Sequence, residues 1–268
     1  MKNVLLTIEY DGSQFHGWQR QNGLLTVQGL LEQVISSIVG QPVEVEGTGR
    51  TDAGVHALGQ CATFKSQLKI PVERLANVIN NGIAKATESI NRPGPVRIIE
   101  AREVNQDFHA RFSAVGKTYR YRLSLGEPDV FQRNYVYQIK DELDLDLMVQ
   151  AAKLMEGTRD FACFQSTGGT PRKTTVRTVY KVEVVNSKPY VDILVTGNGF
   201  LYNMVRIMVG TLVDVASGKL DMRKLEEALK YADRTKAGHT APPFGLAMEK
   251  VYFNQEELNL CCNLKDKE

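Results

Sequence analysis

A glycine-framed turn constrains this chain more than any other stretch of its sequence. It covers residues 47–56, lies between two β-like runs at 43–46 and 58–65, and carries Arg50 and Asp52. Glycine is favoured where φ must be positive or where a ligand comes close to the backbone. If the local chain is extended, Arg50 and Asp52 point to the same side, and the guanidinium holds the carboxylate ionised and aimed. A hairpin turn in which Asp52 caps backbone N–H groups and Arg50 is solvated is the competing interpretation.

The order of the expected elements indicates an α+β protein with two similar halves. The first half has a strand at 4–9, a helix at 27–38 that Thr26 caps and Gly40 ends, the strand–turn–strand unit, a helix opened by Pro71, a loop at 80–95 and a strand at 96–104. The second half has strands at 117–125, 174–185, 190–196 and 248–253, and helices at 143–155, 201–216 and 221–231. The first half has the β-α-β-β-α-β order of a ferredoxin-like (RRM-like) unit, and the second half repeats that order loosely. We therefore expect domains at 1–105 and 106–254, followed by a polar, frayed tail at 255–268.

The charge distribution favours a phosphate-binding face. The formal net charge is only +2, which neither demands nor excludes nucleic acid. Cations gather between residues 92 and 140 and between 165 and 188, and Glu183 is the only acid of the second cluster. Ordinary solvated strand and loop faces are the alternative explanation.

Other residue patterns exclude several classes of protein. Cys61, Cys163, Cys261 and Cys262 lack the spacing of a zinc ribbon or a redox pair, and the four histidines have no convincing metal-ligand spacing. We therefore expect no metal and a reducing compartment. The start of the sequence does not read as a signal peptide, and no apolar run approaches the roughly 20 residues of a membrane helix. By default the expected location is the cytoplasm, without a membrane partner.

Several motifs in fixed order make the chain similar to a known family. They are GRTDAGVHA at 49–57, YDG at 10–12 with FHGWQ at 15–19, TVQ at 26–28, FHARFSA at 108–114 with KTYRY at 117–121, FLYNMVR at 200–206 with VG at 209–210, and TAPP at 240–243 with GL at 245–246. Together they resemble the motifs of the tRNA pseudouridine synthase A family. One such motif is weak evidence, but this many in register are very specific.

The resemblance implies a fold, a reaction and a set of site residues. The antiparallel sheets of the two ferredoxin-like halves would join around a basic central cleft, and the chain would form a homodimer. The substrate would be tRNA, with uridines 38, 39 and 40 of the anticodon stem-loop isomerised to pseudouridine without a cofactor. Asp52 would act at the ribose of a flipped uridine, by attack at C1′ or by removal of the C2′ proton. Arg50 and Arg206 would lie beside Asp52, and Tyr119 would contact the substrate while Tyr121 belongs to the core.

Two loops and two other functions stay open at this stage. The 82–95 segment departs from the family pattern and could present Arg92 to RNA, and the 165–175 segment could grip phosphates or simply connect two elements. On residue pattern alone, both tyrosines could be core residues and Arg206 could lie at the solvated edge of its helix. A non-catalytic RNA-binding or RNA-folding protein on the same scaffold is the main alternative function. A carboxylate-dependent nucleoside hydrolase lacks a second acid or a metal cluster near the turn.

Overall fold

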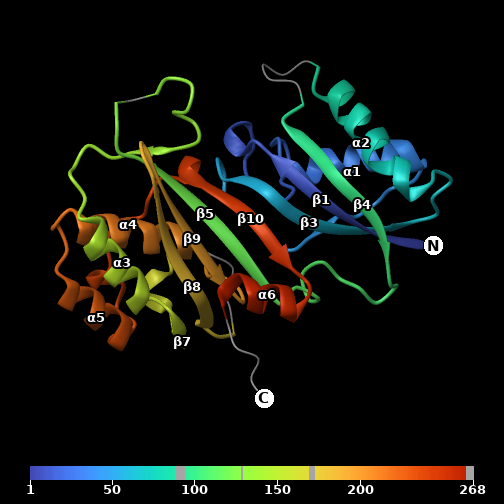
Figure 1. The fold of residues 1–268 in the computed structure, drawn as a ribbon. Helices are drawn as coiled ribbons and strands as arrows, with labels where there is room; N and C mark the ends of the chain where they lie inside the picture. Colours follow the sequence, from blue (N-terminus) through green and yellow to red (C-terminus); the bar gives the residue numbers. More distant parts are fainter. Residues whose placement is uncertain (89–93, 128, 169–172, 264–268) are drawn as a thin grey trace. The chain divides into compact units, whose positions relative to one another are not determined.

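The computed structural model describes residues 1–88, 94–127, 129–168 and 173–263. These residues form a mixed α+β fold that divides into two compact units (Figure 1). The first unit contains Met1–Val115 and Ala247–Phe253, and the second contains Gly116–Leu246 with the described part of Asn254–Glu268. The expected boundary at 105/106 falls ten residues early, because the buried Asn3 amide donates to the carbonyls of Asn105 and Phe108 and so ties this segment to the first strand.

The first unit is a twisted sheet with two helices. Its strands are β1 (Lys2–Tyr10), β2 (Glu46–Gly47), β3 (His56–Ser66), β4 (Val96–Val104) and β10 (Leu246–Tyr252), and its helices are α1 (Val27–Val39) and α2 (Val72–Ala86). β1 lies between β3 and β4 and is antiparallel to both. β2 pairs antiparallel with β3, whereas β10 runs parallel to the start of β3 at His56 and Ala57. The sheet positions the Asp52 turn, because that turn connects β2 to β3.

The predicted ends of α1 are confirmed. The Thr26 side chain accepts a hydrogen bond from Gly29 N, and Gly40 ends the helix in the left-handed region at φ 75°. The strand expected at 43–46 is nearly absent, because side chains of α1 take over its backbone hydrogen bonds. Gln28 donates to Val45 O, and the Glu32 carboxylate accepts from Val45 N.

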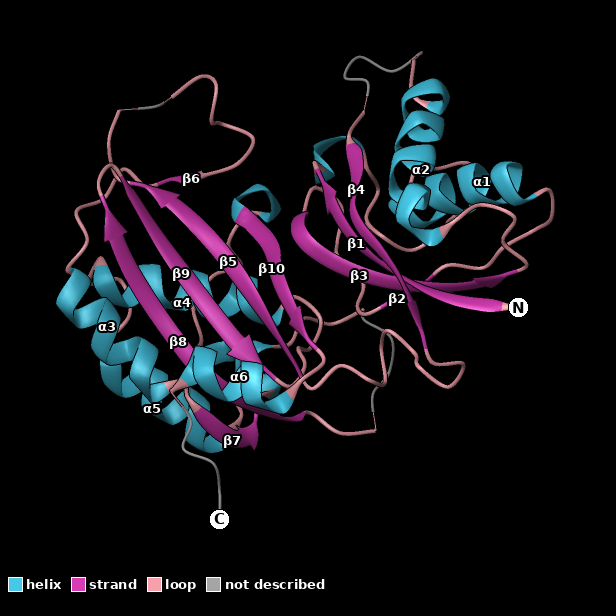
Figure 2. Ribbon diagram, turned by 45° about the vertical axis from the view of Figure 1, so that its right-hand side comes forward, coloured by secondary structure: helices cyan, strands magenta, loops and turns pink. Residues whose placement is uncertain are grey.

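The loop expected from residue 80 is wrong as far as Ala86, because α2 continues to that residue. Gly82 does not break the helix but lets it approach α1, since a Cβ there would lie 2.6 Å from Val34 Cγ1. Asn80 joins α2 to β4 by accepting from Ile98 N and donating to Ile98 O. The two helices lie side by side in both views (Figures 1 and 2). Residues 89–93, including Arg92, lie outside the described residues.

The second unit contains a mostly antiparallel set of strands with helices of its own. Its strands are β5 (Gly116–Ser124), β6 (Tyr137–Gln138), β7 (Gly157–Asp160), β8 (Val176–Ser187) and β9 (Tyr190–Gly197), and its helices are α3 (Leu145–Leu154), α4 (Met204–Ala216), α5 (Met222–Tyr231) and α6 (Gln255–Cys262). The antiparallel order is β5-β9-β8-β7, and β6 adds two residues parallel to β5. The short strands β6 and β7 were not expected from the sequence.

Two helix boundaries differ from expectation. α4 begins at Met204 and not at residue 201, because Asn203 lies in the left-handed region at φ 60°. The tail is not frayed over its first eight residues, which form α6. Asn254 caps that helix by accepting from Glu256 N, and Leu258 is fully buried against Gly116. The polar composition of the tail gave no indication that Leu258 would be buried.

Candidate active site

The Asp52 turn is held by backbone and side-chain contacts within the first unit. Val55 N donates to Asp52 O at 3.1 Å, and Gly54 adopts φ 79°, as in a turn whose third residue must be glycine. Before Asp52, Thr48 donates through both its backbone N–H and its hydroxyl to Cys61 O. No residue of the segment 48–55 belongs to a strand. The period-two argument, which assumes extended chain, therefore stays a prediction for Arg50 and Asp52.

The N-terminal motif forms the other side of this turn. Trp18 N donates to Thr51 O at 3.0 Å, and the Tyr10 hydroxyl lies 2.7 Å from Thr51 Oγ1. Gly17 has φ 86°, and a Cβ there would lie 2.6 Å from Thr51 O. A Cβ on Gly47 would lie 2.5 Å from the buried indole of Trp18. The motifs at 10–19 and 47–57, separate in sequence, thus form one packed cradle around Asp52.

Two neutral groups, a phenol and an imidazole, support this cradle. Burial raises the pKa of Tyr10 to about 12, against the opposing effect of its hydrogen bonds to Thr51 and Gln60. Gly12 N donates to His56 Nδ1 at 3.0 Å, which requires the tautomer protonated on Nε2. The approach of Asp11 Oδ1 to the same nitrogen, at 3.3 Å, is therefore not an ion pair in that tautomer.

Asp52 is half-buried, whereas Arg50 is exposed. Gln60 fixes the backbone between Thr48 and Arg50 by donating to Gly49 O at 2.9 Å. This arrangement agrees with a turn that presents a carboxylate to a ligand. The direct pairing of Arg50 with Asp52 stays a prediction.

The tyrosines of β5 belong to the second unit and differ in their surroundings. Tyr121 is fully buried, as expected for a core residue, and its hydroxyl donates to Pro242 O at 2.8 Å. Burial raises the pKa of Tyr121, an effect that the nearby Arg206 opposes. Tyr119 retains 8% exposure and makes an edge-to-face contact with Phe200, with ring centroids 5.2 Å apart. Its contact with substrate stays a prediction.

Arg206 is half-buried and firmly oriented. Its Nε donates to Ala241 O and one terminal nitrogen donates to Asn203 Oδ1, both at 2.8 Å, while Ala241 N donates back to Arg206 O. The Asn203 amide also donates to Ser166 Oγ at 3.1 Å. Sequence reasoning missed Asn203, although an asparagine one turn before an arginine in an apolar helix is a usable signal.

Within the second unit, α4 packs closely against the 238–242 segment at Gly210. A Cβ on Gly210 of α4 would lie 1.9 Å from His239 O, so glycine is required where the 238–242 segment crosses the helix. The carboxylate of Asp214, also on α4, accepts from His239 N at 2.9 Å and so holds the same segment at a second point. Together these contacts fix Ala241, which in turn orients Arg206.

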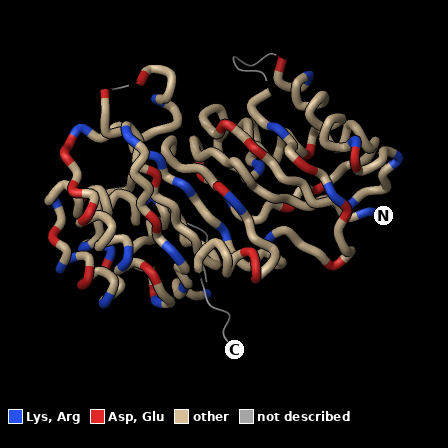
Figure 3. The backbone as a smooth tube through the Cα atoms, viewed as in Figure 1, with Lys and Arg blue, Asp and Glu red and all other residues tan. Residues whose placement is uncertain are grey.

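Three cations of the two basic clusters are seen paired with carboxylates. Arg97 pairs with Glu9, Lys181 with Glu183, and Arg122 makes a two-pronged hydrogen bond to Asp192 with both distances 2.7 Å. Figure 3 shows Lys and Arg interspersed with Asp and Glu in both units. At these three positions the paired charges favour ordinary solvated faces over a phosphate-binding face. Residues 169–172 of the second cluster, including Arg172, lie outside the described residues.

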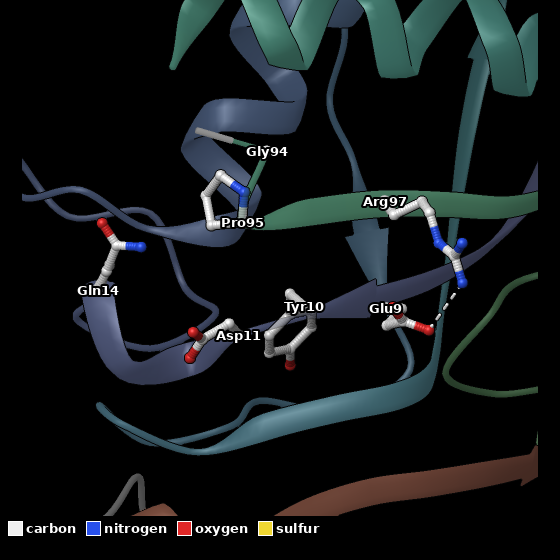
Figure 4. Close-up of a pocket in the computed structure, with 7 residues that line it drawn as sticks. All are labelled: Glu9, Tyr10, Asp11, Gln14, Gly94, Pro95 and Arg97. Atoms are coloured by element: carbon white, nitrogen blue, oxygen red, sulfur yellow. Dashed lines mark hydrogen bonds and ion pairs between the residues drawn. The ribbon is translucent and has the colours of Figure 1, made fainter. Parts of the chain in front are cut away.

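A surface pocket of about 240 Å³ lies beside the N-terminal loop of the first unit (Figure 4). It is lined by Glu9, Tyr10, Asp11, Gln14, Gly94, Pro95 and Arg97. The lining carries two carboxylates and one guanidinium, and that guanidinium already pairs with Glu9. This balance of charge does not favour a phosphate, so the pocket is a poor candidate for an RNA backbone.

Two kinds of feature, a metal-binding cluster and a membrane-spanning helix, are missing from the described residues. No three His, Cys, Asp or Glu side chains among residues 1–88, 94–127, 129–168 and 173–263 are grouped to hold a metal ion. In that same part of the chain, no helix is long and apolar enough to span a membrane.

Comparisons with known proteins identify the class. The family model described as tRNA pseudouridine synthase matches residues 6–113 and 151–254. The protein named tRNA pseudouridine synthase A 2 of Clostridium tetani is 41% identical over 257 residues, which cover 94% of this chain and 99% of that relative. Proteins named tRNA pseudouridine synthase A from Thermoanaerobacter sp. and Clostridium acetobutylicum are 40% and 42% identical over 254 residues, which cover 94% of this chain and 100% of each relative.

These matches define an RNA-modifying isomerase. The chain belongs to the tRNA pseudouridine synthase family, and the resemblance seen in its motifs is confirmed. Its reaction is the isomerisation of uridine to pseudouridine in tRNA.

Proposed function

We propose that the chain modifies uridines 38, 39 and 40 in the anticodon stem-loop of tRNA, with Asp52 as the reacting carboxylate. The observation that carries the assignment of Asp52 is the cradle, in which buried contacts from two motifs fix the backbone on both sides of one half-buried aspartate. A reacting group must be held within fractions of an ångström of its target, and a turn with this many fixed contacts provides such rigidity.

The reaction rearranges one nucleotide and adds no atoms. The C1′–N1 bond breaks, the uracil turns, a C1′–C5 bond forms, C5 loses a proton and N1 gains one. An ionised carboxylate beside the sugar can attack C1′ or take the C2′ proton, and Asp52 supplies that group in the proposal. Tyr119 offers a flat ring on which the flipped base stacks. Arg206 and Arg50 pair with the Asp52 carboxylate, or Arg50 fills the space that the flipped base vacates.

The finer features of the fold and assembly belong to the same proposal. We propose that each unit is a variant of the ferredoxin-like (RRM-like) fold, and that their antiparallel sheets join around a basic central cleft. The strand order of the first unit, β4-β1-β3 with β2 beside β3, supports the first part of this proposal. We also propose that the chain forms a homodimer and acts in the cytoplasm, where tRNA is available. Sedimentation of the purified chain tests the dimer.

The decisive experiment maps pseudouridine in unmodified tRNA after incubation with the purified chain. The reaction is followed by tritium release from uracil C5, in the wild type and in Asp52→Asn. The variant should form no detectable product yet bind tRNA with wild-type affinity, because the amide keeps the size of the side chain and loses its charge. Glu103→Gln is the matched control, since its carboxylate is exposed and pairs only weakly with Lys2. Product formed by Asp52→Asn at the wild-type rate would remove Asp52 from the mechanism, and product at other positions would refute the 38–40 assignment.

A further inference from the structure

The motif at 108–114 has no role in the reaction described above, yet the structure holds it rigidly. It lies in the segment between β4 and β5, within the first unit. The Phe108 ring packs on Phe253 with centroids 5.1 Å apart, and Ala110 is fully buried with its N–H directed at Thr63 Oγ1. Together with the two hydrogen bonds from Asn3, these contacts fix the start of the segment.

His109 locks the centre of the segment. Its Nδ1 accepts from Arg111 N at 3.0 Å, and its Nε2 lies 3.3 Å from the Glu46 carboxylate. A neutral imidazole protonated on Nε2 satisfies both contacts at once. Ser113 closes the turn, because its hydroxyl accepts from His109 N and its backbone N–H donates to His109 O.

The two side chains that this turn directs outward are a cation and an aromatic ring. Phe112 is 75% exposed, and its ring lies 4.4 Å from the His109 ring, centroid to centroid. The Arg111 guanidinium lies over the Phe112 ring at 5.5 Å from its centroid. An exposed phenylalanine forgoes the stabilisation that burial would give. A fixed turn that keeps one in solvent is therefore better explained by a ligand than by the stability of the chain.

The surroundings of Phe112 favour RNA over a protein as that ligand. A stable protein interface buries about 1,200–2,000 Å² and has an apolar core. Among the described residues 105–115, Phe112 is the only large apolar side chain that is exposed, and its ring contacts the Arg111 guanidinium and the His109 ring. One aromatic face beside a guanidinium is instead the chemistry that stacks a nucleobase and neutralises the adjacent phosphate.

We propose that Arg111 and Phe112 form an RNA-stacking platform, on which an unpaired or terminal base of the tRNA substrate stacks while Arg111 contacts a phosphate. The proposal rests on the proposed function only in taking tRNA as the ligand. It does not depend on Asp52 chemistry. Binding measurements therefore test it even where no pseudouridine forms.

The first experiment compares Phe112→Ala with the matched control Phe131→Ala. Phe131 is 88% exposed and lies in the second unit. Phe112→Ala should weaken tRNA binding by roughly 5- to 150-fold, the range measured for loss of one aromatic stacking partner. The single-turnover rate on saturating tRNA should stay within about twofold, and Phe131→Ala should change neither quantity. Equal tRNA affinity of Phe112→Ala and the wild type would overturn the proposal.

A second variant reports the contact directly. Phe112→Trp keeps an aromatic platform and adds an exposed indole to a chain whose single tryptophan, Trp18, is buried. Its red-shifted emission should be quenched by tRNA, with wild-type affinity. Emission that tRNA leaves unchanged would contradict stacking. A change of sedimentation in Phe112→Ala, without a change in tRNA affinity, would show that this surface meets a second copy of the chain and would also overturn the proposal.

Discussion

The hydrogen bond between Tyr10 and Thr51 offers a quantitative test of the cradle around Asp52. The two hydroxyl oxygens are 2.7 Å apart, and both side chains are almost fully buried. Removing one hydroxyl leaves the other without this partner, at a cost of about 1–3 kcal/mol of unfolding free energy. We therefore expect Tyr10→Phe and Thr51→Val each to destabilise the first unit by roughly that amount.

The double variant should cost less than the sum of the single variants. When both hydroxyls are absent, neither has lost the bond to the other while staying buried, so the coupling should be about 0.5–1.5 kcal/mol. The measurement is urea unfolding followed by tryptophan emission. The only tryptophan, Trp18, has its ring 6.2 Å from that of Tyr10, so its emission reports on this part of the molecule. Strictly additive single-variant effects, or losses below about 0.5 kcal/mol, would refute the account of the cradle given above.

Two further predictions concern pH and the orientation of Arg206. Because the pKa of folded Tyr10 is raised to about 12 from an ordinary value of 10.0, its contribution to stability is complete below about pH 10 and is lost as pH rises toward about 12. Urea midpoints measured across this window should fall less steeply in Tyr10→Phe than in the wild type, and equal slopes would contradict the assignment. Asn203→Gly keeps the left-handed backbone but removes the acceptor of Arg206, so kcat should fall about tenfold or more. Asn203→Asp keeps an acceptor for Arg206 and should restore most of the rate. Equal kcat values for Asn203→Gly and Asn203→Asp would show that Asn203 does not position Arg206.

The elements that the sequence predicted well are those whose ends are determined locally. Thr26 and Gly40 delimit α1 through contacts within three or four residues, and Asp221 caps α5 in the same way. Such short-range signals are fully present in the sequence. No sequence pattern, by contrast, shows that Gly17 and Trp18 of the N-terminal motif contact Thr51.

The errors have one physical cause, which is hydrogen bonding and packing between distant residues. Residues 43–45 have strand-like composition, but Gln28 and Glu32 of α1 satisfy their backbone. Asn80 and Gly82 look like helix breakers, yet one bonds to β4 and the other makes room for Val34. In the candidate site, Asn203 was missed for the same reason, because it orients Arg206 through a hydrogen bond and its own residue type does not indicate a reaction.

The position of β1 has a consequence for how the chain folds as it is synthesised. β1 is synthesised before both of its neighbours, so its two edges stay unpaired until β3 and β4 have followed. The start of β3, next to the Asp52 turn, gains its parallel neighbour only when residues 247 and 248 emerge. The nascent protein must therefore keep β1 from wrong pairings until Val104 has been synthesised, and the strand start beside the Asp52 turn is among the last parts to be completed.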